Sequence, residues 1–298
     1  MTERAQIAFL SDGRRLHLHD GPIDLIVEAF GDAGEVQAAY TAAVKRFATI
    51  LDELCGELPL LRQGAGPDAL ALRGAVAGRM LHAVLPYAAE TFITPMAAVA
   101  GAVAEEVLSS MTQAANLTRA FVNDGGDIAL HIGDGEEFTV GMVERPERPS
   151  LFGTVKLRSS DAIHGIATSG WRGRSFSLGI ADSVTVLAES AAAADAAATI
   201  IANAVDLPGH PAIKRVPACE IVLDSDLGSR LVTQAVGELS GAEVELALSL
   251  GVSTAESLVQ RGLICAAALR LQGETRTAGV LPRLNAVASI SSGRLVHA

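Results

Sequence analysis

Apolar and polar residues alternate near the start of the chain, which is the pattern of strands with one buried face. The alternation predicts strands over residues 5–10, 15–19 and 23–30. Turn signals rich in Asp and Gly separate these strands. From Glu35 to Leu61 the apolar residues instead recur every three or four positions, and this spacing predicts one long amphipathic helix.

The middle of the chain predicts two helical segments and a hairpin. Residues 69–85 are expected to be helical in part. Thr94 before Pro95 suits the start of a helix that continues through small residues to Glu106. Such a helix is expected to be buried, and either its N-terminus accepts an anion or its small residues simply pack tightly. An Asn-Asp-Gly-Gly turn between two apolar runs predicts a hairpin over residues 120–132.

The second half of the chain opens with a stretch, residues 165–205, that predicts a strand, a Gly-rich turn, a second strand and an Ala-rich helix. The pattern beyond it predicts a strand at 218–223, a turn at 224–228 leading into a helix up to 239, helices at 242–249 and 254–260, and a strand at 263–271. Two further regions are expected to be irregular, a polar loop over 144–149 and loosely packed residues after Gly273.

The Ala-rich helix carries two polar residues, Asp195 and Thr199, whose spacing puts them on one helical face. Their neighbours are mostly apolar, and a carboxylate in such surroundings is costly unless it is paired or bound to a metal. Mg²⁺ takes oxygen ligands of this kind. Two interpretations therefore stay open: a magnesium site, or an Asp195 that caps a backbone amide or pairs with Arg172 or Arg174.

The Gly-rich turn before this helix contains Ser169, Gly170, Arg172, Gly173 and Arg174. Glycines let a ligand approach the backbone, and guanidinium groups bind phosphates with two hydrogen bonds. The turn therefore predicts a phosphate site, and a surface hairpin with a charged tip is the equally weighted alternative.

Other candidate motifs are weaker. His17 and His19 alternate on one strand face and could bind a metal, but no third ligand is evident, so an exposed strand face is the favoured interpretation. The sequence contains no Walker A motif, no G-x-G-x-x-G motif and no convincing Ser/His/Asp or Cys/His arrangement.

Composition narrows the class of protein. The 298 residues carry a formal net charge of −11, which argues against nucleic-acid binding but leaves room for one basic nucleotide pocket. The three cysteines are far apart and have no C-x-x-C spacing, which favours a reducing compartment without structural zinc. No signal peptide and no span-length apolar run is evident, so we expect a cytoplasmic protein without membrane contact.

The chain resembles the ApbE family, flavin transferases that attach FMN from FAD to a Ser or Thr. The general resemblance covers about residues 90–205 and is carried, in order, by Asn123-Asp124-Gly125-Gly126-Asp127, Ala167-Thr168-Ser169-Gly170, Ser183-Val184-Thr185-Val186 and Ala194-Asp195-Ala196-Ala197-Ala198-Thr199. A shorter ApbE-related branch of uncharacterised function is similar over nearly the whole chain, through the pieces Gly21-Pro22-Ile23-Asp24-Leu25, Thr94-Pro95-Met96-Ala97-Ala98-Val99-Ala100-Gly101 and Asp224-Ser225-Asp226-Leu227-Gly228.

The resemblance implies a T-fold-like α/β (α+β) architecture, with mixed or antiparallel sheets packed against helices. It implies a single domain over 1–298, in which 206–298 form a C-terminal α/β extension. It also implies that FAD or FMN binds together with Mg²⁺, and that Asp195 and Thr199 are the metal ligands. The residues expected at the flavin or other phosphate-bearing ligand are Thr94, Met96, Asn123, Gly125, Gly126, Asp127, Thr168, Ser169, Gly170 and Arg172.

One segment departs from the transferases. They carry His-x-x-Asp-Pro-x-Thr-Gly between the Thr-Ser-Gly turn and the Val-Thr-Val strand, whereas this chain has residues 175–182, without the His and without Pro-x-Thr-Gly. Two functions therefore compete: FMN transfer, or a non-catalytic ligand-binding or accessory role on the same scaffold. Small-residue helices beside a large sheet are also compatible with a homodimer.

Overall fold

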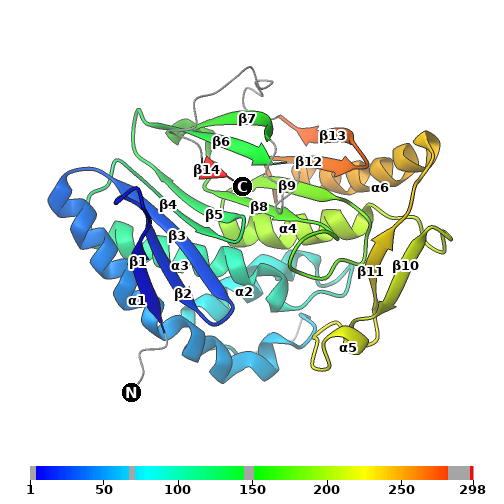
Figure 1. The fold of residues 1–298 in the computed structure, drawn as a ribbon, viewed down its shortest axis with the longest axis horizontal. Coiled ribbons are helices and arrows are strands. Elements are labelled where there is room, and N and C mark those ends of the chain that lie inside the picture. Colours follow the sequence, from blue (N-terminus) through cyan, green and yellow to red (C-terminus); the bar gives the residue numbers. More distant parts are fainter. Residues whose placement is uncertain (1–4, 67–70, 144–150, 281–295, 298) are drawn as a thin grey trace.

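The computed structural model describes residues 5–66, 71–143, 151–280 and 296–297 (Figure 1). One nine-stranded sheet, in the order β1-β2-β3-β4-β5-β8-β9-β12-β13, forms its centre, and all its neighbouring strands are antiparallel. Its strands are β1 (Gln6–Phe9), β2 (Leu16–Asp20), β3 (Ile23–Phe30), β4 (Arg119–Asp124), β5 (Asp127–Ile132), β8 (Gly165–Ser169), β9 (Ser183–Ala188), β12 (Ala266–Leu271) and β13 (Glu274–Gly279).

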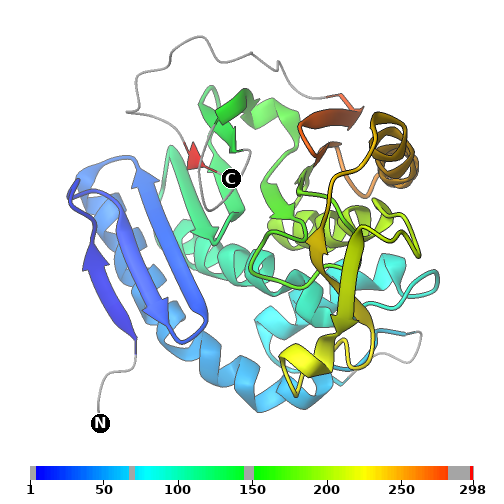
Figure 2. The ribbon, with the colours of Figure 1, turned by 45° about the vertical axis from the view of Figure 1, so that its right-hand side comes forward.

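Helices cover one face of this sheet, and the larger apolar core lies between the helices and the sheet (Figures 1 and 2). The α-helices are α1 (Ala33–Leu61), α2 (Ala75–Val84), α3 (Val99–Ala114), α4 (Ala191–Ala204), α5 (Ala218–Ile221) and α6 (Gly241–Gln260), and the short 3₁₀ turns are η1 (Leu85–Tyr87), η2 (Pro95–Ala98) and η3 (Ser159–Asp161). Helix α3 packs between α1 and α4, beneath β4 and β5.

A smaller layer covers part of the opposite face. Strands β6 (Glu137–Val143) and β7 (Leu151–Arg158) form an antiparallel hairpin, which β14 (Val296–His297) joins in parallel. Phe138 and Leu157 from this hairpin pack with Phe121, Ile128 and other buried residues of the large sheet in a second core. The remaining pair, β10 (Ile213–Pro217) and β11 (Leu231–Val236), forms a separate two-stranded sheet.

Local sequence patterns explain several of these elements. In β2, Leu16 and Leu18 are buried on the helical side, whereas His17 and His19 face the other way and are partly exposed. The alternating strands, the long α1, the hairpin over 120–132 and the order strand, turn, strand, helix over 165–205 are confirmed. A mixed α/β fold with a large antiparallel sheet packed against helices is likewise confirmed.

The predictions for the C-terminal third are partly wrong. Residues 218–223 begin as the short helix α5 rather than a strand, and the helix predicted up to residue 239 is replaced by strand β11, because its residues pair with β10. The two helices predicted over 242–260 are one helix, α6. Gly251 does not break it: a Cβ there would lie 2.3 Å from Cγ2 of Val205, so this glycine permits close packing.

Besides β11, four strands were not predicted. Strands β7 and β10 lie in stretches to which the sequence pattern assigned no strand, and β13 and β14 lie where loose packing was expected. Strand β13 is stabilised by pairing with β12, which no local pattern shows. The polar loop predicted over 144–149 lies outside the described residues. No helix in the described part of the chain is long and apolar enough to cross a membrane.

Candidate functional site

A cavity of about 910 Å³ lies between the end of the sheet and helices α1, α3 and α4. One part of its wall is apolar and is formed by Leu51, Leu54, Leu58, Leu61, Met96, Val99 and Val103. Another part is polar and includes Asn123, Asp124, Asp127, Thr168, Ser169, Asp195 and Thr199. This size and mixture are typical of sites that hold a small molecule by apolar contact and orient it with a few polar groups.

The turn between β4 and β5 brings two carboxylates to the polar wall. Gly125 and Gly126 adopt positive φ angles of 63° and 119°, which residues with a Cβ rarely reach. The N–H of Gly126 donates to Oδ1 of Asn123 over 2.8 Å and closes the turn. Asp124 and Asp127 are therefore paired directly across the hairpin, with both residues at the cavity.

Helix α4 brings the third carboxylate. The hydroxyl of Ser190 caps its first turn by accepting from the N–H of Ala193, which fixes the start of the helix. Asp195 then accepts from the N–H of Gly101 on α3 over 3.1 Å. A Cβ on Gly101 would lie 2.3 Å from the carbonyl oxygen of Ala191, so only glycine allows α3 and α4 to approach this closely.

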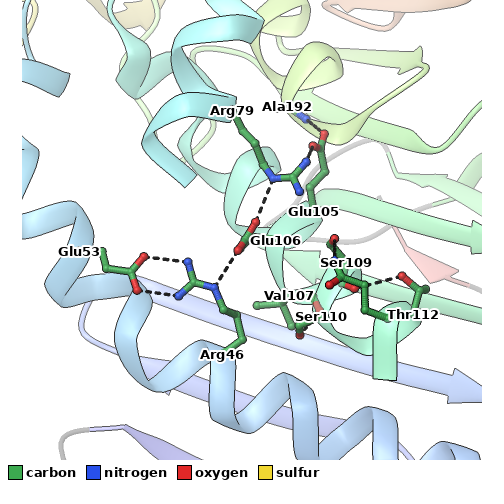
Figure 3. A network of polar contacts seen from close by, with 11 residues as sticks. Arg46, Glu53, Arg79, Glu105, Glu106, Val107, Ser109, Ser110, Thr112 and Ala192 are labelled. Atoms are coloured by element: carbon green, nitrogen blue, oxygen red, sulfur yellow. Dashed lines mark hydrogen bonds and ion pairs between the residues drawn. The ribbon is translucent and has the colours of Figure 1, made fainter. Parts of the chain in front are cut away.

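A network of charged side chains holds the start of α4 in place (Figure 3). Glu105 accepts from the N–H of Ala192 over 2.7 Å, and its other oxygen receives a hydrogen bond from Arg79. Arg79 also contacts Glu106, which is bound in turn by Arg46. A carboxylate at the N-terminus of a helix is favourable because the free N–H groups there carry partial positive charge. The network therefore helps to position Asp195 on the following turn.

Electrostatics distinguish the three cavity carboxylates from ordinary surface groups. Burial, together with the negative charge of Asp127, raises the pKa of Asp124 to about 8. Burial also raises the pKa of Asp195 to about 7. The pKa of Asp127 lies well above its usual value, because it is buried and faces Asp195. Within the described residues, no Lys, Arg or His forms an ion pair with any of the three.

The donor set fits a hard cation that keeps ligands from outside the protein. Asp195 and Thr199 both line the cavity and offer a carboxylate and a hydroxyl oxygen. No group of three or more His, Cys, Asp or Glu side chains in the described part of the chain is arranged to hold a metal by itself. Mg²⁺ commonly binds through one or two carboxylates and takes its other ligands from water and substrate phosphates. The residues present therefore fit Mg²⁺ better than a metal enclosed by protein side chains.

Most of the residues predicted for the ligand site lie at this one cavity. The residues that line it are Met96, Asn123, Gly125, Gly126, Asp127, Thr168, Ser169 and Gly170, together with Asp195 and Thr199. Asp127 also accepts from the N–H of Thr168 over 3.1 Å, which ties the β4–β5 turn to the end of β8.

Two predicted residues lie elsewhere. Thr94 is not at the cavity wall, and its hydroxyl donates to Asp226 instead of capping the helix that follows it. Arg172 donates to Asp182 over 2.7 Å, stacks on Trp171 and lines a separate cavity of about 470 Å³. Each of these side chains is bound instead to a carboxylate that does not line the main cavity, Asp226 for Thr94 and Asp182 for Arg172.

The structure adds residues that sequence reasoning did not assign to the ligand. Arg62 and Arg174 line the main cavity and supply the positive charge expected of Arg172. Arg174 belongs to the Gly-rich turn that the sequence predicted as a phosphate site, so of these two arginines only Arg62 is new. The apolar residues of α1 were predicted only as a packing face. His17 and Asp24 also line the cavity, although His17 was interpreted as part of an exposed strand face.

Fold and site together define a mixed α/β protein with an acidic, partly apolar ligand cleft. The model of the family described as "AbpE bacteria" matches residues 7–277. The chain therefore belongs to this ApbE-like family.

Curated relatives are similar over part of their length. A UPF0280 protein of Methanopyrus kandleri is 34% identical over 174 residues, which are 58% of this chain and 67% of the relative. A UPF0280 protein of Methanococcus vannielii is 40% identical over 138 residues, 45% of this chain and 55% of the relative. The matches thus span between about half and two thirds of these relatives.

Solved structures of flavin transferases are similar in outline. A mutant of the flavin transferase ApbE from Vibrio cholerae has a TM-score of 0.47 at 11% identity, over 92% of this chain and 95% of the other. The apo flavinyl transferase ApbE of Pseudomonas stutzeri has a TM-score of 0.39 at 13% identity, over 92% and 94%. Similarity of this size carries no argument about activity.

Proposed function

We propose that this protein binds a flavin nucleotide, FAD or FMN, or another phosphate-bearing ligand together with Mg²⁺ at Asp195 and Thr199. The observation that carries the proposal is the set of three cavity carboxylates without an ion-pair partner among the described residues. Burying such charges is costly unless a cation accompanies them. Family membership supports the same proposal.

The other cavity residues suit the remaining parts of such a ligand. The apolar wall formed by α1 and α3 offers a surface for a flat ring system. Gly170 adopts a φ of 157°, and a Cβ there would lie 2.6 Å from the carbonyl oxygen of Asp182, so the turn approaches its neighbour too closely for any other residue. Ser169 and Arg174, on either side of this glycine, can donate to phosphate oxygens. Bound Mg²⁺ would neutralise the carboxylates and share oxygens of the phosphate.

The reaction in keeping with the family resemblance is transfer of FMN from FAD to a hydroxyl group. The competing proposal is a ligand-binding or accessory protein without catalysis. It is favoured by the packing of residues 175–182, where Ile180 and Ala181 are fully buried and Asp182 is bound to Arg172. In that segment only Ser175 lines the cavity, so the chain presents no reactive side chain where the transferases carry their His.

Titration of the purified protein with FAD tests the binding proposal, by flavin fluorescence and calorimetry with and without Mg²⁺. We expect micromolar binding that needs Mg²⁺ and is lost in Asp195→Asn. The matched control is Glu53→Gln, which removes a charge that does not line the cavity and should bind as the wild type does. Equal, weak signals for wild type and Asp195→Asn at high micromolar FAD would reject the proposal. Covalent FMN on an acceptor protein would reject the accessory role.

A further inference from the structure

One histidine and one carboxylate at the cavity form a directed pair. Nε2 of His17, on β2, lies 2.5 Å from Oδ1 of Asp24, on β3. Both residues line the main cavity. The contact occupies one ring nitrogen of His17, and no described residue provides a hydrogen-bond partner for the other, Nδ1. A carboxylate on one nitrogen fixes the tautomer and the orientation of the ring.

This pair is connected to the acidic wall through the backbone. The N–H of Asp24 donates a hydrogen bond to the carboxylate of Asp124. The two residues are neighbours because β3 and β4 pair at Leu25 and Asp124. Across the sheet, His17 is paired with Ile26 and Ile26 with Asn123, and all three residues line the cavity. The imidazole therefore lines the same cavity as the proposed phosphate and magnesium groups, from the sheet face that points away from the helices.

The neighbouring histidine provides a comparison within the same strand. His19 points to the same side of β2, and its Nδ1 lies 4.0 Å from the other oxygen of Asp24. It does not line the cavity. A purely structural role of Asp24 would concern both histidines, whereas a role toward a bound molecule concerns His17 alone.

We propose that His17, oriented by Asp24, accepts the proton of a hydroxyl group that attacks the phosphate-bearing ligand in the cavity. This inference rests on the proposed function. With FAD, the hydroxyl oxygen of water or of a Ser or Thr forms a bond to the phosphorus of the FMN half. The P–O bond to the AMP half breaks, and its electron pair leaves with AMP. The hydroxyl proton moves to Nδ1 of His17, which then returns it to solvent or to AMP.

The test measures FMN release from FAD and Mg²⁺ in water, alongside FAD binding, for wild type, His17→Gln, His19→Gln and Asp24→Asn. A general base contributes about 100-fold or more, so His17→Gln should lose at least about 100-fold in turnover while binding FAD within about threefold of wild type. His19→Gln is the matched control and should keep its turnover within about twofold. Asp24→Asn should lower kcat and leave KM unchanged, because Asp24 orients the ring and keeps its backbone N–H.

Two further readouts separate proton transfer from folding. Added imidazole should restore FMN release to His17→Ala, because the free base can occupy the vacated space. Diethyl pyrocarbonate should modify His17 less when FAD and Mg²⁺ are bound, with His19 unaffected, and this measurement needs no turnover.

Each other outcome contradicts the assignment. Full turnover in His17→Gln overturns the role of His17. Binding of FAD by wild type without release of FMN overturns it as well and leaves the proposed binding function standing. Failure of wild type to bind FAD with Mg²⁺ rejects both. If His17→Gln unfolds, as seen by circular dichroism, the protection measurement on the wild type decides, and equal modification of His17 with and without FAD and Mg²⁺ overturns the assignment.

Discussion

Two groups of three carboxylates differ in whether arginines of the chain form ion pairs with them. Glu53, Glu105 and Glu106 are joined by Arg46 and Arg79 into one network on α1, α2 and α3 (Figure 3). Asp124, Asp127 and Asp195 face the cavity without an ion-pair partner among the described residues. The first group forms ion pairs with arginines of the chain, whereas the second forms none among the described residues, and Arg174 acts on Asp124 only from beyond ion-pair distance.

The pKa directions express this difference. Hydrogen bonding to Arg46 lowers the pKa of Glu53. Burial by itself raises the pKa of Glu106, but Arg46 and Arg79 outweigh it, and the net pKa is lowered. At the cavity burial wins, and all three pKa values rise. A carboxylate paired with arginine stabilises the fold. A buried carboxylate without an ion pair is costly, and this favours the proposal that a cation binds beside it.

The largest expected effect concerns the unmatched group. Asp195→Asn removes the charge that we propose to bind Mg²⁺ and should weaken Mg²⁺-dependent FAD binding by about 100-fold, or about 2.7 kcal/mol. Calorimetric titration measures it. Glu106→Gln, which removes a carboxylate from the matched network, should leave the affinity within about threefold. Equal losses in both variants would erase the distinction between the two groups.

The next effect concerns the matched group. Arg46→Met leaves Glu53 and Glu106 without the guanidinium that joins them, and both are partly buried. Loss of one member of such a pair should lower the free energy of unfolding by about 2 kcal/mol, after allowance for solvent screening. Urea denaturation provides the measurement, with Arg276→Met as the control, expected within about 0.5 kcal/mol of wild type because its partners Glu245 and Glu274 are exposed. A stable Arg46→Met would show that the network is dispensable.

A smaller effect concerns the free energy of unfolding, which the substitution of Asp195 should raise, whereas most substitutions lower it. Burial raises the pKa of Asp195 from 3.8 to about 7, so the folded protein keeps a proton at pH values where the unfolded chain has lost it. The cost of this charge is absent below about pH 4, grows as the pH rises and is complete above about pH 7. Without Mg²⁺, the wild type should therefore be less stable at about pH 8 than at about pH 5.

Asp195→Asn should escape this loss and gain about 1 kcal/mol over wild type at about pH 8 without Mg²⁺. Thermal melts at the two pH values, with and without Mg²⁺, check the sign. Mg²⁺ should restore the wild type and leave Asp195→Asn unchanged. A destabilised Asp195→Asn in chelator at high pH would contradict the reading of this carboxylate as an unpaired charge.

The smallest effect lies at the cavity mouth. Arg62 lines the cavity and is bound by the exposed Asp224 over 2.7 Å. Asp224→Asn should leave the melting temperature unchanged, because exposed ion pairs contribute little. It should raise the affinity for FAD by up to about threefold, because Arg62 is released toward the phosphates. A lower affinity in Asp224→Asn would show that Asp224 contributes to ligand binding, and that it does not compete with the ligand for Arg62.

Much of the site follows from short-range patterns. The Asn-Asp-Gly-Gly turn specifies its own hairpin. Ser190 specifies the start of α4, the helix on which Asp195 contacts Gly101 of α3. Such features depend on neighbours in the chain, so a sequence shows them. The C-terminal predictions failed where pairing decided the outcome: residues 231–236 are a strand because β10 lies beside them.

The sequence by itself determined the local geometry: alternating strands, a glycine turn with Asp124 and Asp127 across it, and a capped helix with Asp195 and Thr199 on one face. Only the tertiary structure decided which charges are matched. It directed Arg172 to Asp182 and away from the cavity, and it placed His17 beside Asp24. The physical reason is range: turns and caps involve adjacent residues, whereas the pairing of a charge depends on which distant side chain packing brings within reach.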